Sequence, residues 1–468
     1  MYFLNKQFFN KCRHIHFIGI GGSGMYPLAQ ILHGRGYYLT GSDNNETETL
    51  QAVRNMGIPV FLGQRAENIE GAELIVHTAA IMADNPELIA AKASGVPVLE
   101  RSEMLGIITE EFDNAICVSG THGKTTTTSM ITQILVESGL DISAVIGGKL
   151  PLIHGSGRSG SSDIMVCEAC EFQDHFLNLS VDTAVITNVD EDHLDYFKNL
   201  DNIIKSFHKF CENAKKAVIV NGDDANSMKA VEGITGKKII TFGFDSKNDY
   251  YADNIELAGL VTGFDAYCGG KKLGRVTLNV AGRHNVLNAL AAIAAAENCG
   301  VPFDGITKAL FNFRGAGRRF EKYGEVGGIT VVDDYAHHPA EIAVTLNAAV
   351  KLGYKRVWAV HQPFTFSRTA LLLDDFAKAL SIADKVVLTS IMGSREKNTL
   401  GIHTKALADK IEGSVYFDEE EHDPNFELTA QYVAEHAEEG DLIVTLGCGD
   451  INKVARRILE ILDEKYNR

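Results

Sequence analysis

One stretch decides the class of fold: Ala115-Ile-Cys-Val-Ser-Gly-Thr-His-Gly-Lys-Thr-Thr126. Its first five residues are apolar or small and predict a buried strand, and residues 125–138 have helical character and end at Gly139. A strand that passes through a glycine turn into a helix is the unit of α/β proteins with a mostly parallel sheet. The stretch therefore predicts an α/β fold.

Three segments of the chain repeat this order of strand, turn and helix. At about 150 residues per domain, the length of 468 residues also fits three domains. We expect them at residues 1–112, 113–323 and 324–468. The expected strands are 14–20, 37–41, 74–78, 115–119, 163–167, 184–187, 217–221, 329–332, 357–360, 386–388, 415–417 and 442–446. Glycine-broken runs at 238–242, 263–267 and 275–280 predict antiparallel hairpins at the edge of the second sheet.

The amino-acid composition and the net charge limit which classes of protein this chain can belong to. Hydrophobic residues make up 45% and charged residues 22%, which is typical of a soluble globular chain. The formal net charge of −17 argues against general nucleic-acid binding. No window reaches the roughly 18 apolar residues of a membrane span, and Met1–Lys11 lacks the features of a signal peptide. We therefore expect a cytoplasmic protein without a membrane span.

The eight cysteines are too dilute for a disulfide framework. Cys167 and Cys170 are the only close pair, and a zinc site would need a second pair. Most of the thiols lie in apolar stretches, where cysteine packs as a small hydrophobe. We expect packing rather than metal binding.

A first glycine turn, Gly19-Ile-Gly-Gly-Ser-Gly24, follows the first strand, and Asp43 ends the next strand. This matches the dinucleotide fingerprint, in which backbone amides approach a diphosphate and a carboxylate accepts hydrogen bonds from ribose or base. A nicotinamide or flavin nucleotide is one interpretation, but any nucleotide diphosphate suits the loop. The structural alternative is a tight turn that only packs a helix on a strand.

A second turn, Gly120-Thr-His-Gly-Lys-Thr-Thr126, is a compressed phosphate loop. The strict P-loop pattern has glycine where this chain has Val118. Backbone amides at the helix start can still hold phosphates, Lys124 can neutralise the β and γ oxygens, and Thr125 can bind Mg²⁺. The turn predicts ATP or GTP binding. A simple dehydrogenase would not require two phosphate loops.

Acidic and histidine side chains follow two strands of the second segment. Glu168 ends one strand, where ligands bind in this architecture, and oxygen ligands suit Mg²⁺. His193 is a plausible partner for a second ion. The intervening run 190–192 can be no more than a solvated acidic loop.

Further candidates lie at later helix starts and strand ends. Asn285 and Asn288 share a helix face, where their amides could read an adenine edge, although Asn285 could instead cap the helix. The basic turn Arg314–Arg319 suits a transferring phosphoryl group. Histidine and arginine recur at 333–339 and 361–369, which follow two strands and are expected at one sheet edge.

Together these motifs resemble the Mur ligase family. The resemblance rests on residues 19–25, 120–126, 282–285 and 334–339 with Glu168, Asn188 and His193, and it covers nearly the whole chain in order. It implies a UDP-binding Rossmann-like domain, a central P-loop ATPase-like domain and a C-terminal Rossmann-like domain that binds the amino acid. It also implies ATP-dependent ligation of L-alanine to UDP-N-acetylmuramate through an acyl phosphate, with Mg²⁺, in peptidoglycan precursor synthesis.

The resemblance also implies roles for individual residues. The UDP-sugar would contact Gly21, Gly22, Ser23, Gly24, Ser42, Asp43, His77 and Thr78. ATP would contact Gly120, Thr121, His122, Gly123, Lys124, Thr125, Thr126, Asn285, Arg319 and Asp334. The metal would be held by Thr125, Glu168 and His193. Catalytic roles fall to Lys124, Glu168, His193, His337 and Arg368, with Tyr335 facing the amino acid or the muramoyl carboxylate.

This chain departs from the family pattern at two places. The family often has Gln-Pro-His-Arg-Tyr-Ser-Arg-Thr, whereas Phe364 and Thr365 replace the His and first Arg here, so only Arg368 carries over. The family often has Glu-Ala-Asp-Glu-Ser, whereas the run from Glu168 to Phe172 reads Glu-Ala-Cys-Glu-Phe, which removes an acidic neighbour.

Three other hypotheses stay open on the sequence. A nicotinamide-dependent oxidoreductase would bind NAD(P) and no ATP. A regulatory P-loop switch without ligase chemistry would tolerate replacement of Glu168 by alanine. A sister ligase would attach a peptide or a different amino acid to a related UDP-sugar.

Overall fold

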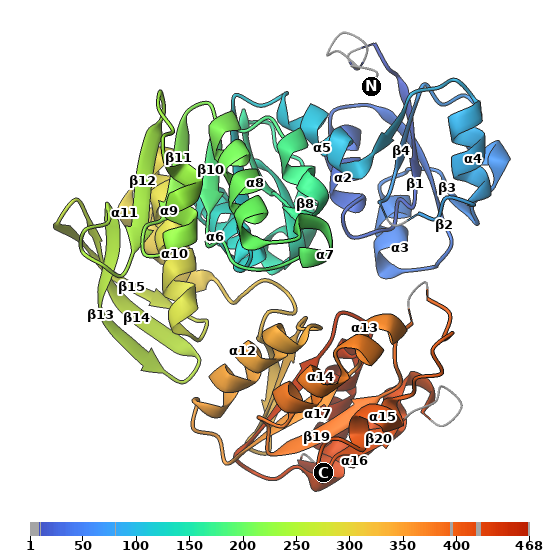
Figure 1. The fold of residues 1–468 in the computed structure, drawn as a ribbon, viewed down its shortest axis with the longest axis vertical. Helices are drawn as coiled ribbons and strands as arrows, with labels where there is room; N and C mark the ends of the chain where they lie inside the picture. The colour runs from blue at the N-terminus through green and yellow to red at the C-terminus, as the bar shows by residue number, and fades with distance from the viewer. Residues whose placement is uncertain (1–8, 10, 80, 394–395, 418–422, 467–468) are drawn as a thin grey trace. The chain divides into compact units, whose positions relative to one another are not determined.

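Three β-sheets organise the computed structural model, which describes residues 9, 11–79, 81–393, 396–417 and 423–466 (Figure 1). The α/β class predicted from the sequence is confirmed. Most of the segment Met1–Lys11, for which we expected no signal peptide, lies outside the described residues.

The first sheet has five parallel strands in the order β3-β2-β1-β4-β5. Its central strands are apolar and fully paired, and they form a core with the buried side of helix α2. The strands are β1 (His14–Ile18), β2 (Tyr38–Asp43), β3 (Val60–Leu62), β4 (Leu74–His77) and β5 (Val98–Glu100). The helices are α2 (Tyr26–Gly34), α3 (Glu48–Asn55), α4 (Pro86–Ala93) and α5 (Arg101–Thr109).

The second sheet has ten strands in the order β15-β14-β13-β12-β11-β10-β6-β9-β7-β8. The strands are β6 (Asn114–Ser119), β7 (Ser143–Leu150), β8 (Gly155–Arg158), β9 (Ile164–Glu168), β10 (Thr183–Ile186), β11 (Ala217–Asn221), β12 (Lys238–Gly243), β13 (Tyr250–Ala258), β14 (Val261–Cys268) and β15 (Lys271–Leu278). The helices are α6 (Lys124–Glu137), α7 (Leu194–Phe197), α8 (Leu200–Asn213), α9 (Ala225–Val231), α10 (Arg283–Asn298) and α11 (Phe303–Asn312).

One expectation for this sheet is wrong. Strands β14 and β15 form an antiparallel pair, as predicted, but β12 runs parallel to β11 and to β13. Residues 238–242 suit a strand of either direction. The direction of β12 is decided by the connection from β11 through α9, and not by the sequence of the strand itself.

Helix α6 depends on tertiary packing. It opens with Lys-Thr-Thr-Thr-Thr, and β-branched residues are mediocre helix formers. It packs against α10, whose alanines from Ala289 to Ala296 are buried and let the two helices approach closely. This contact compensates for the weak intrinsic preference of the threonine run.

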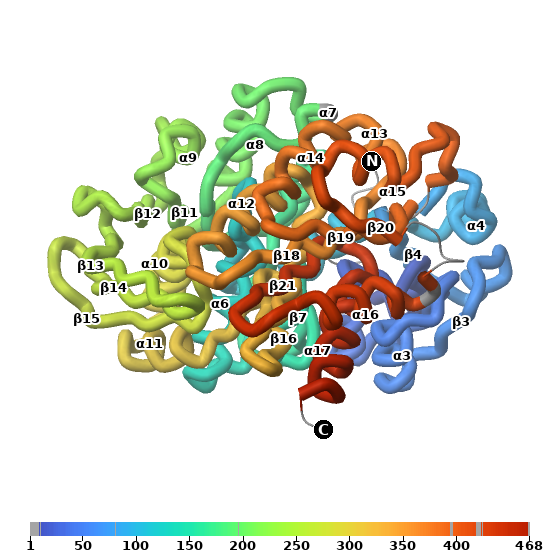
Figure 2. The backbone as a smooth tube through the Cα atoms, turned by 90° about the horizontal axis from the view of Figure 1, so that it is seen from below, coloured from blue at the N-terminus to red at the C-terminus, as the bar shows by residue number. Residues whose placement is uncertain are grey.

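The third sheet has six strands in the order β16-β17-β21-β18-β19-β20, and only β16 is antiparallel to its neighbour. Helices α16 and α17 lie side by side and share one apolar cluster, while α12 and α14 cover another (Figure 2). The strands are β16 (Glu321–Val326), β17 (Ile329–Asp334), β18 (Arg356–His361), β19 (Lys385–Thr389), β20 (Val415–Phe417) and β21 (Asp441–Leu446). The helices are α12 (Pro339–Val350), α13 (Phe366–Leu371), α14 (Leu373–Leu380), α15 (Thr404–Ala408), α16 (Glu427–His436) and α17 (Asn452–Tyr466).

The chain divides into two compact units. The first contains the first two sheets and ends at Phe313, and the second begins at Arg314 with the third sheet. The boundary expected after residue 112 falls between α5 and β6, but the one expected after residue 323 falls inside β16. This edge strand, Glu-Lys-Tyr-Gly-Glu-Val, lacks the apolar alternation that would reveal it.

Cysteine packing and surface charge agree with the composition. Cys117 and Cys167 are buried neighbours on β6 and β9, with their sulfurs 3.3 Å apart, so the packing expected for Cys167 is confirmed.

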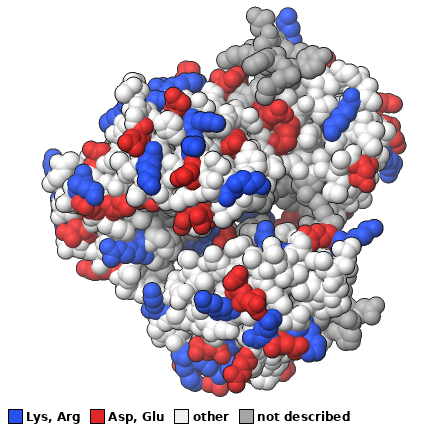
Figure 3. Space-filling view, in the orientation of Figure 1, with Lys and Arg blue, Asp and Glu red and all other residues white. Residues whose placement is uncertain are grey.

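Acidic and basic side chains are interspersed on the face shown in Figure 3. Among the described residues, no helix has the length and apolarity needed to cross a membrane.

Candidate active site

The glycine loop after β1 is held by the end of β2. The Ser42 main-chain oxygen accepts the N–H groups of Gly19 and Ile20 at 2.8 and 3.0 Å, and the Asp43 carboxylate accepts the N–H of Gly21 at 3.0 Å. A Cβ on Gly21 would come within 2.9 Å of that carboxylate, so a larger residue would push Asp43 away. Asp43 therefore shapes the loop directly.

The other residues expected to contact a UDP-sugar lie at the same sheet edge. Thr78 packs against Gly19, where a Cβ would approach its methyl group to 2.9 Å, and His77 Nδ1 lies 3.0 Å from the Thr78 oxygen. Ligands bind beyond the carboxyl ends of strands in such sheets. The loops after β1, β2 and β4 bring together Gly21, Gly22, Ser23, Gly24, Ser42, Asp43, His77 and Thr78.

The phosphate loop after β6 needs glycine at two positions. Gly120 and Gly123 have φ values of 139° and 84°, which favour glycine. A Cβ on Gly123 would also lie 2.5 Å from Asn288 Oδ1. The loop and the first turn of α6 contain all seven predicted phosphate contacts, Gly120, Thr121, His122, Gly123, Lys124, Thr125 and Thr126.

Asn188, which follows β10, fixes the loop backbone. Its amide accepts the N–H of His122 and donates to the His122 oxygen, both at 2.9 Å. Thr187 donates to the same oxygen, and the Thr121 N–H donates to the main-chain oxygen of Asn188 at 3.0 Å. These bonds hold the turn in shape without a ligand.

Lys124 forms a largely buried ion pair with Glu171. Its Nζ lies 2.8 Å from Glu171 Oε1, and the exposed fractions of the two side chains are 17% and 4%. Burial would lower the pKa of Lys124, but the Glu171 carboxylate more than offsets this and raises it. The ammonium also donates to the oxygens of Gly120 and Thr121, at 2.5 and 3.1 Å, so a phosphate oxygen must replace one of three partners. Sequence reasoning gave Glu171 no role, because its partner Lys124 lies 47 positions away along the chain.

Thr125 and Glu168 fit a magnesium ion. The Thr125 hydroxyl donates to Glu168 Oε1 at 3.0 Å, and Glu168 Oε2 accepts the N–H of Gly147 at 2.8 Å. Both side chains offer oxygen ligands beside the phosphate loop, which is the donor set that Mg²⁺ prefers. Nearby, the second Glu171 oxygen is buried without a hydrogen-bond partner among the described residues, so the site has unused acceptor capacity.

The third expected metal ligand, His193, lies in a different group. It has the left-handed conformation, with φ 50°, and its ring contacts the ring of Phe172 at 4.7 Å between centroids. His193, Asp192 and Glu171 each offer a ligand atom within 4.8 Å of the others. Asp192, which we expected to belong to a solvated loop, therefore lies close to His193. Glu171 links this group to Lys124.

Asn285 and Asn288 contact each other beside the phosphate loop. The Asn288 amide donates to Asn285 Oδ1 at 3.0 Å, while its own oxygen accepts the Thr127 hydroxyl at 3.2 Å. Asn285 Nδ2 donates to the oxygen of Ala281 at 2.7 Å. Helix α10 begins after Gly282 without a side-chain cap, so the capping interpretation of Asn285 is wrong. Its adenine contact stays a prediction.

The second unit brings Arg319, Asp334 and Tyr335 together after β17. The buried Asp334 carboxylate accepts the N–H groups of Phe320 and Ala336, each at 2.8 Å. Burial raises the pKa of Asp334, and the charge of Arg319 partly offsets this. The Arg319 guanidinium lies 5.6 Å from the Tyr335 ring centre. The histidine and arginine clusters therefore share one sheet edge, as expected.

Arg318, the neighbour of Arg319, has a structural role. Its guanidinium donates to Asp333 at 2.8 Å and to the oxygens of Gly447 and Gly449. The expectation that the whole basic turn is available to a phosphoryl group is wrong for Arg318, because its donors are used inside the unit.

His337 and Arg368 both lie near Phe364. The ring centres of His337 and Phe364 are 6.1 Å apart, and the Arg368 guanidinium lies 5.9 Å from the Phe364 ring. Arg368 Nη1 is buried without a hydrogen-bond partner among the described residues. A buried guanidinium with unused donors suits an anionic ligand group.

His337 also pairs with Glu341 on the first turn of α12, with Nδ1 3.2 Å from the carboxylate. Burial would raise the pKa of Glu341, but hydrogen bonds and charge from His337 lower it to about 2, against an ordinary value of 4.5. A carboxylate with a depressed pKa stabilises the fold above its ordinary pKa, and this contribution is lost as the pH falls through about 2.

We therefore expect Glu341→Gln to flatten the acid side of the stability profile between about pH 4.5 and 2. The fluorescence of Trp358, the single tryptophan, reports unfolding of the second unit. A variant that loses stability over this interval as steeply as the parent chain would contradict the assignment.

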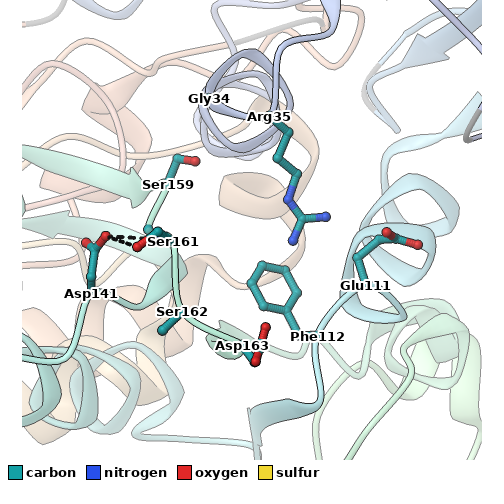
Figure 4. A pocket seen from close by; sticks show the side chains of 10 residues that line it. Gly34, Arg35, Glu111, Phe112, Asp141, Ser159, Ser161, Ser162 and Asp163 are labelled. Atoms are coloured by element: carbon teal, nitrogen blue, oxygen red, sulfur yellow. Dashed lines mark hydrogen bonds between the residues drawn. The ribbon is translucent and has the colours of Figure 1, made fainter.

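A cavity of about 440 Å³ in the first unit lies apart from these loops (Figure 4). The Arg35 guanidinium lies 4.4 Å from the Phe112 ring centre, and Ser161 donates to Asp141. None of the described residues that line it was predicted as a site residue. They are Gly34, Arg35, Glu111, Phe112, Asp141, Ser159, Gly160, Ser161, Ser162 and Asp163.

The fold and the loop around Lys124 define a nucleotide-binding α/β enzyme. Three family models match consecutive parts of the chain: the catalytic domain of the Mur ligase family over residues 14–113, the Mur ligase middle domain over 118–296, and the glutamate ligase domain of Mur ligases over 318–449. The chain belongs to the Mur ligase family.

Individual relatives agree over nearly the full length. A UDP-N-acetylmuramate–L-alanine ligase from Agathobacter rectalis is 44% identical over 460 residues, which cover 97% of this chain and 99% of the relative. The crystal structure of a UDP-N-acetylmuramate-alanine ligase from Thermotoga maritima is 29% identical with a TM-score of 0.79, covering 97% and 99%. A murein peptide ligase from Psychrobacter arcticus is 26% identical with a TM-score of 0.72, covering 96% and 98%.

Proposed function

We propose that this enzyme joins L-alanine to the lactyl carboxylate of UDP-N-acetylmuramate, with conversion of ATP to ADP and phosphate, in peptidoglycan precursor synthesis. The observation that carries the proposal is that one chain has two phosphate-type loops, on two different sheets, and is 44% identical to a relative with this named activity. We also propose a cytoplasmic location, which membership of the Mur ligase family supports.

The proposed roles follow the geometry of each loop. The glycine loop with Ser42, Asp43, His77 and Thr78 binds the UDP-sugar, and the loop around Lys124 binds ATP. Thr125 and Glu168 would hold Mg²⁺, with His193 as a further ligand. The ion would supply charge neutralisation at the phosphates of ATP. Asn285, Arg319 and Asp334 contact ATP, and His337 and Arg368 face the amino acid or the muramoyl carboxylate.

In the proposed reaction the lactyl carboxylate attacks the γ-phosphorus of ATP, and ADP leaves. Lys124 stabilises the charge that develops on the transferred group. The amine of L-alanine then attacks the acyl carbon, loses a proton, and displaces phosphate to leave an amide. Lys124 can take this role only after a phosphate oxygen has replaced one of its three hydrogen-bond partners, the oxygens of Gly120 and Thr121 and the Glu171 carboxylate.

A substrate-omission assay tests the assignment. With ATP and Mg²⁺ present, we expect ADP release only when both UDP-N-acetylmuramate and L-alanine are added, and mass detection of the amide product. ADP release that does not depend on both would contradict the proposal.

A second candidate is a ligase that attaches a peptide, because the murein peptide ligase of P. arcticus shares the fold over 96% of this chain. The same assay with a peptide in place of L-alanine separates the two. Amide formation with the peptide alone would favour the second candidate.

A further inference from the structure

A fully buried carboxylate with no assigned role lies behind the glycine loop. Glu87, the second residue of α4, has no exposed surface, nor has His16 on β1. Glu87 Oε1 lies 2.7 Å from His16 Nε2, and Oε2 accepts the Ser42 hydroxyl at 2.6 Å. The network continues away from the loop: His16 Nδ1 and His14 Nε2 each lie 2.8 Å from the Thr40 hydroxyl. It ends where His14 Nδ1 lies 2.7 Å from the main-chain oxygen of Gly71.

These five hydrogen bonds need five hydrogens. Two neutral imidazoles and two hydroxyls supply one each, which makes four, and an ionised carboxylate supplies none. The network is complete only when it holds one additional proton, on a histidine or on Glu87. In each case the sum of its charges is zero, which limits the desolvation cost at the fully buried His16 and Glu87.

The network reaches the glycine loop through Ser42. Glu87 holds the Ser42 hydroxyl, and the Ser42 main-chain oxygen holds the first two N–H groups of the loop, those of Gly19 and Ile20. Asp43, the next residue, holds Gly21. A displacement of Ser42 therefore changes the loop that approaches the diphosphate.

We propose that Glu87 and His16 are positioning residues for the nucleotide sugar, which hold Ser42 and the glycine loop in place through their buried hydrogen bonds. This inference rests on the proposed function, because it takes the glycine loop to be the UDP site.

Two variants separate positioning from general stability. Glutamine at 87 brings its own N–H groups, so all five bonds form without the additional proton. Glu87→Gln is therefore expected to keep KM for the sugar within about twofold of the parent chain. Glu87→Ala leaves Ser42 and His16 without a partner and is expected to raise that KM about tenfold, with kcat and KM for ATP within about twofold.

The matched control is Asp441→Asn in the second unit. Asp441 is also fully buried, and it accepts hydrogen bonds from Arg356 and the Trp358 indole. This control is expected to lower the melting temperature and leave both KM values unchanged. If Glu87→Ala does not fold, Glu87→Asp decides, because its carboxylate is one methylene too short to hold both Ser42 and His16 and is expected to raise KM for the sugar alone.

The outcomes distinguish this inference from the proposed function. Full-length parent chain that does not bind UDP-N-acetylmuramate in a calorimetric titration would overturn the function itself. Parent chain that binds it, together with a Glu87→Ala variant that leaves KM for the sugar unchanged or raises both KM values alike, or a Glu87→Gln variant as impaired as Glu87→Ala, would overturn the positioning role alone.

Discussion

Replacement of Lys124 by methionine is expected to reduce kcat by about 10³-fold or more, because the residue is the cation of the phosphate loop and its charge acts where negative charge develops. Lys124→Arg is not expected to rescue turnover, since the compact ammonium already bonds Gly120, Thr121 and Glu171 in a confined position. ADP release in the complete reaction mixture measures the effect.

The single variant also leaves Glu171 buried without its partner, which lowers stability. A double variant, Lys124→Met with Glu171→Met, removes both charges and is expected to regain stability but not turnover. Lys247→Met is the control, because Lys247 is exposed and forms a surface ion pair with Asp245. Recovery of activity in the double variant would show that the loss came from unfolding rather than from catalysis.

Arg318→Met is expected to destabilise the second unit by about 3–5 kcal/mol, because it leaves the fully buried Asp333 without its ion pair and frees the oxygens of Gly447 and Gly449. Burial already raises the pKa of Asp333, and Arg318 is the main group that opposes this rise. Denaturant unfolding followed by Trp358 fluorescence measures the change in the unit that contains both residues.

The control is Arg457→Met, which breaks partly exposed pairs with Glu427 and Glu460 on the same unit. Surface pairs contribute about 0–1 kcal/mol, so a much smaller change is expected. Equal losses for the two variants, or a loss below about 1 kcal/mol for Arg318→Met, would contradict the structural role of Arg318.

Much of the fold could be predicted because its strands are apolar and its loops contain glycine. The buried strands β1, β6 and β17 carry runs of apolar residues that end in glycine or acidic residues, and each was predicted. Short or polar edge strands such as β3, β8 and β16 lack that pattern, because a strand with one partner and an exposed face needs few apolar residues.

The candidate site was predictable where a single loop carries the chemistry. Glu168 ends β9, and Thr125 follows the turn after β6. Because β6 and β9 are adjacent parallel strands, the two side chains come together as expected. Glu171 and Arg318 could not be assigned from the sequence, since their partners Lys124 and Asp333 are identified only by the approach of separate elements. His193 lies with Glu171 and Asp192 because its left-handed backbone turns it toward them.

By itself the sequence determined the class of fold, the two phosphate-type loops and the family, since local patterns of apolar residues and glycine specify strands, turns and backbone approach. Only the tertiary structure decided which charged groups meet. The pairing of Lys124 with Glu171, of Arg318 with Asp333 and of Glu87 with His16 joins residues 15 to 71 positions apart. An unpaired charge inside a protein is too costly to persist, so burial makes such pairing obligatory. Which partner lies near enough to form the pair cannot be inferred from the sequence alone.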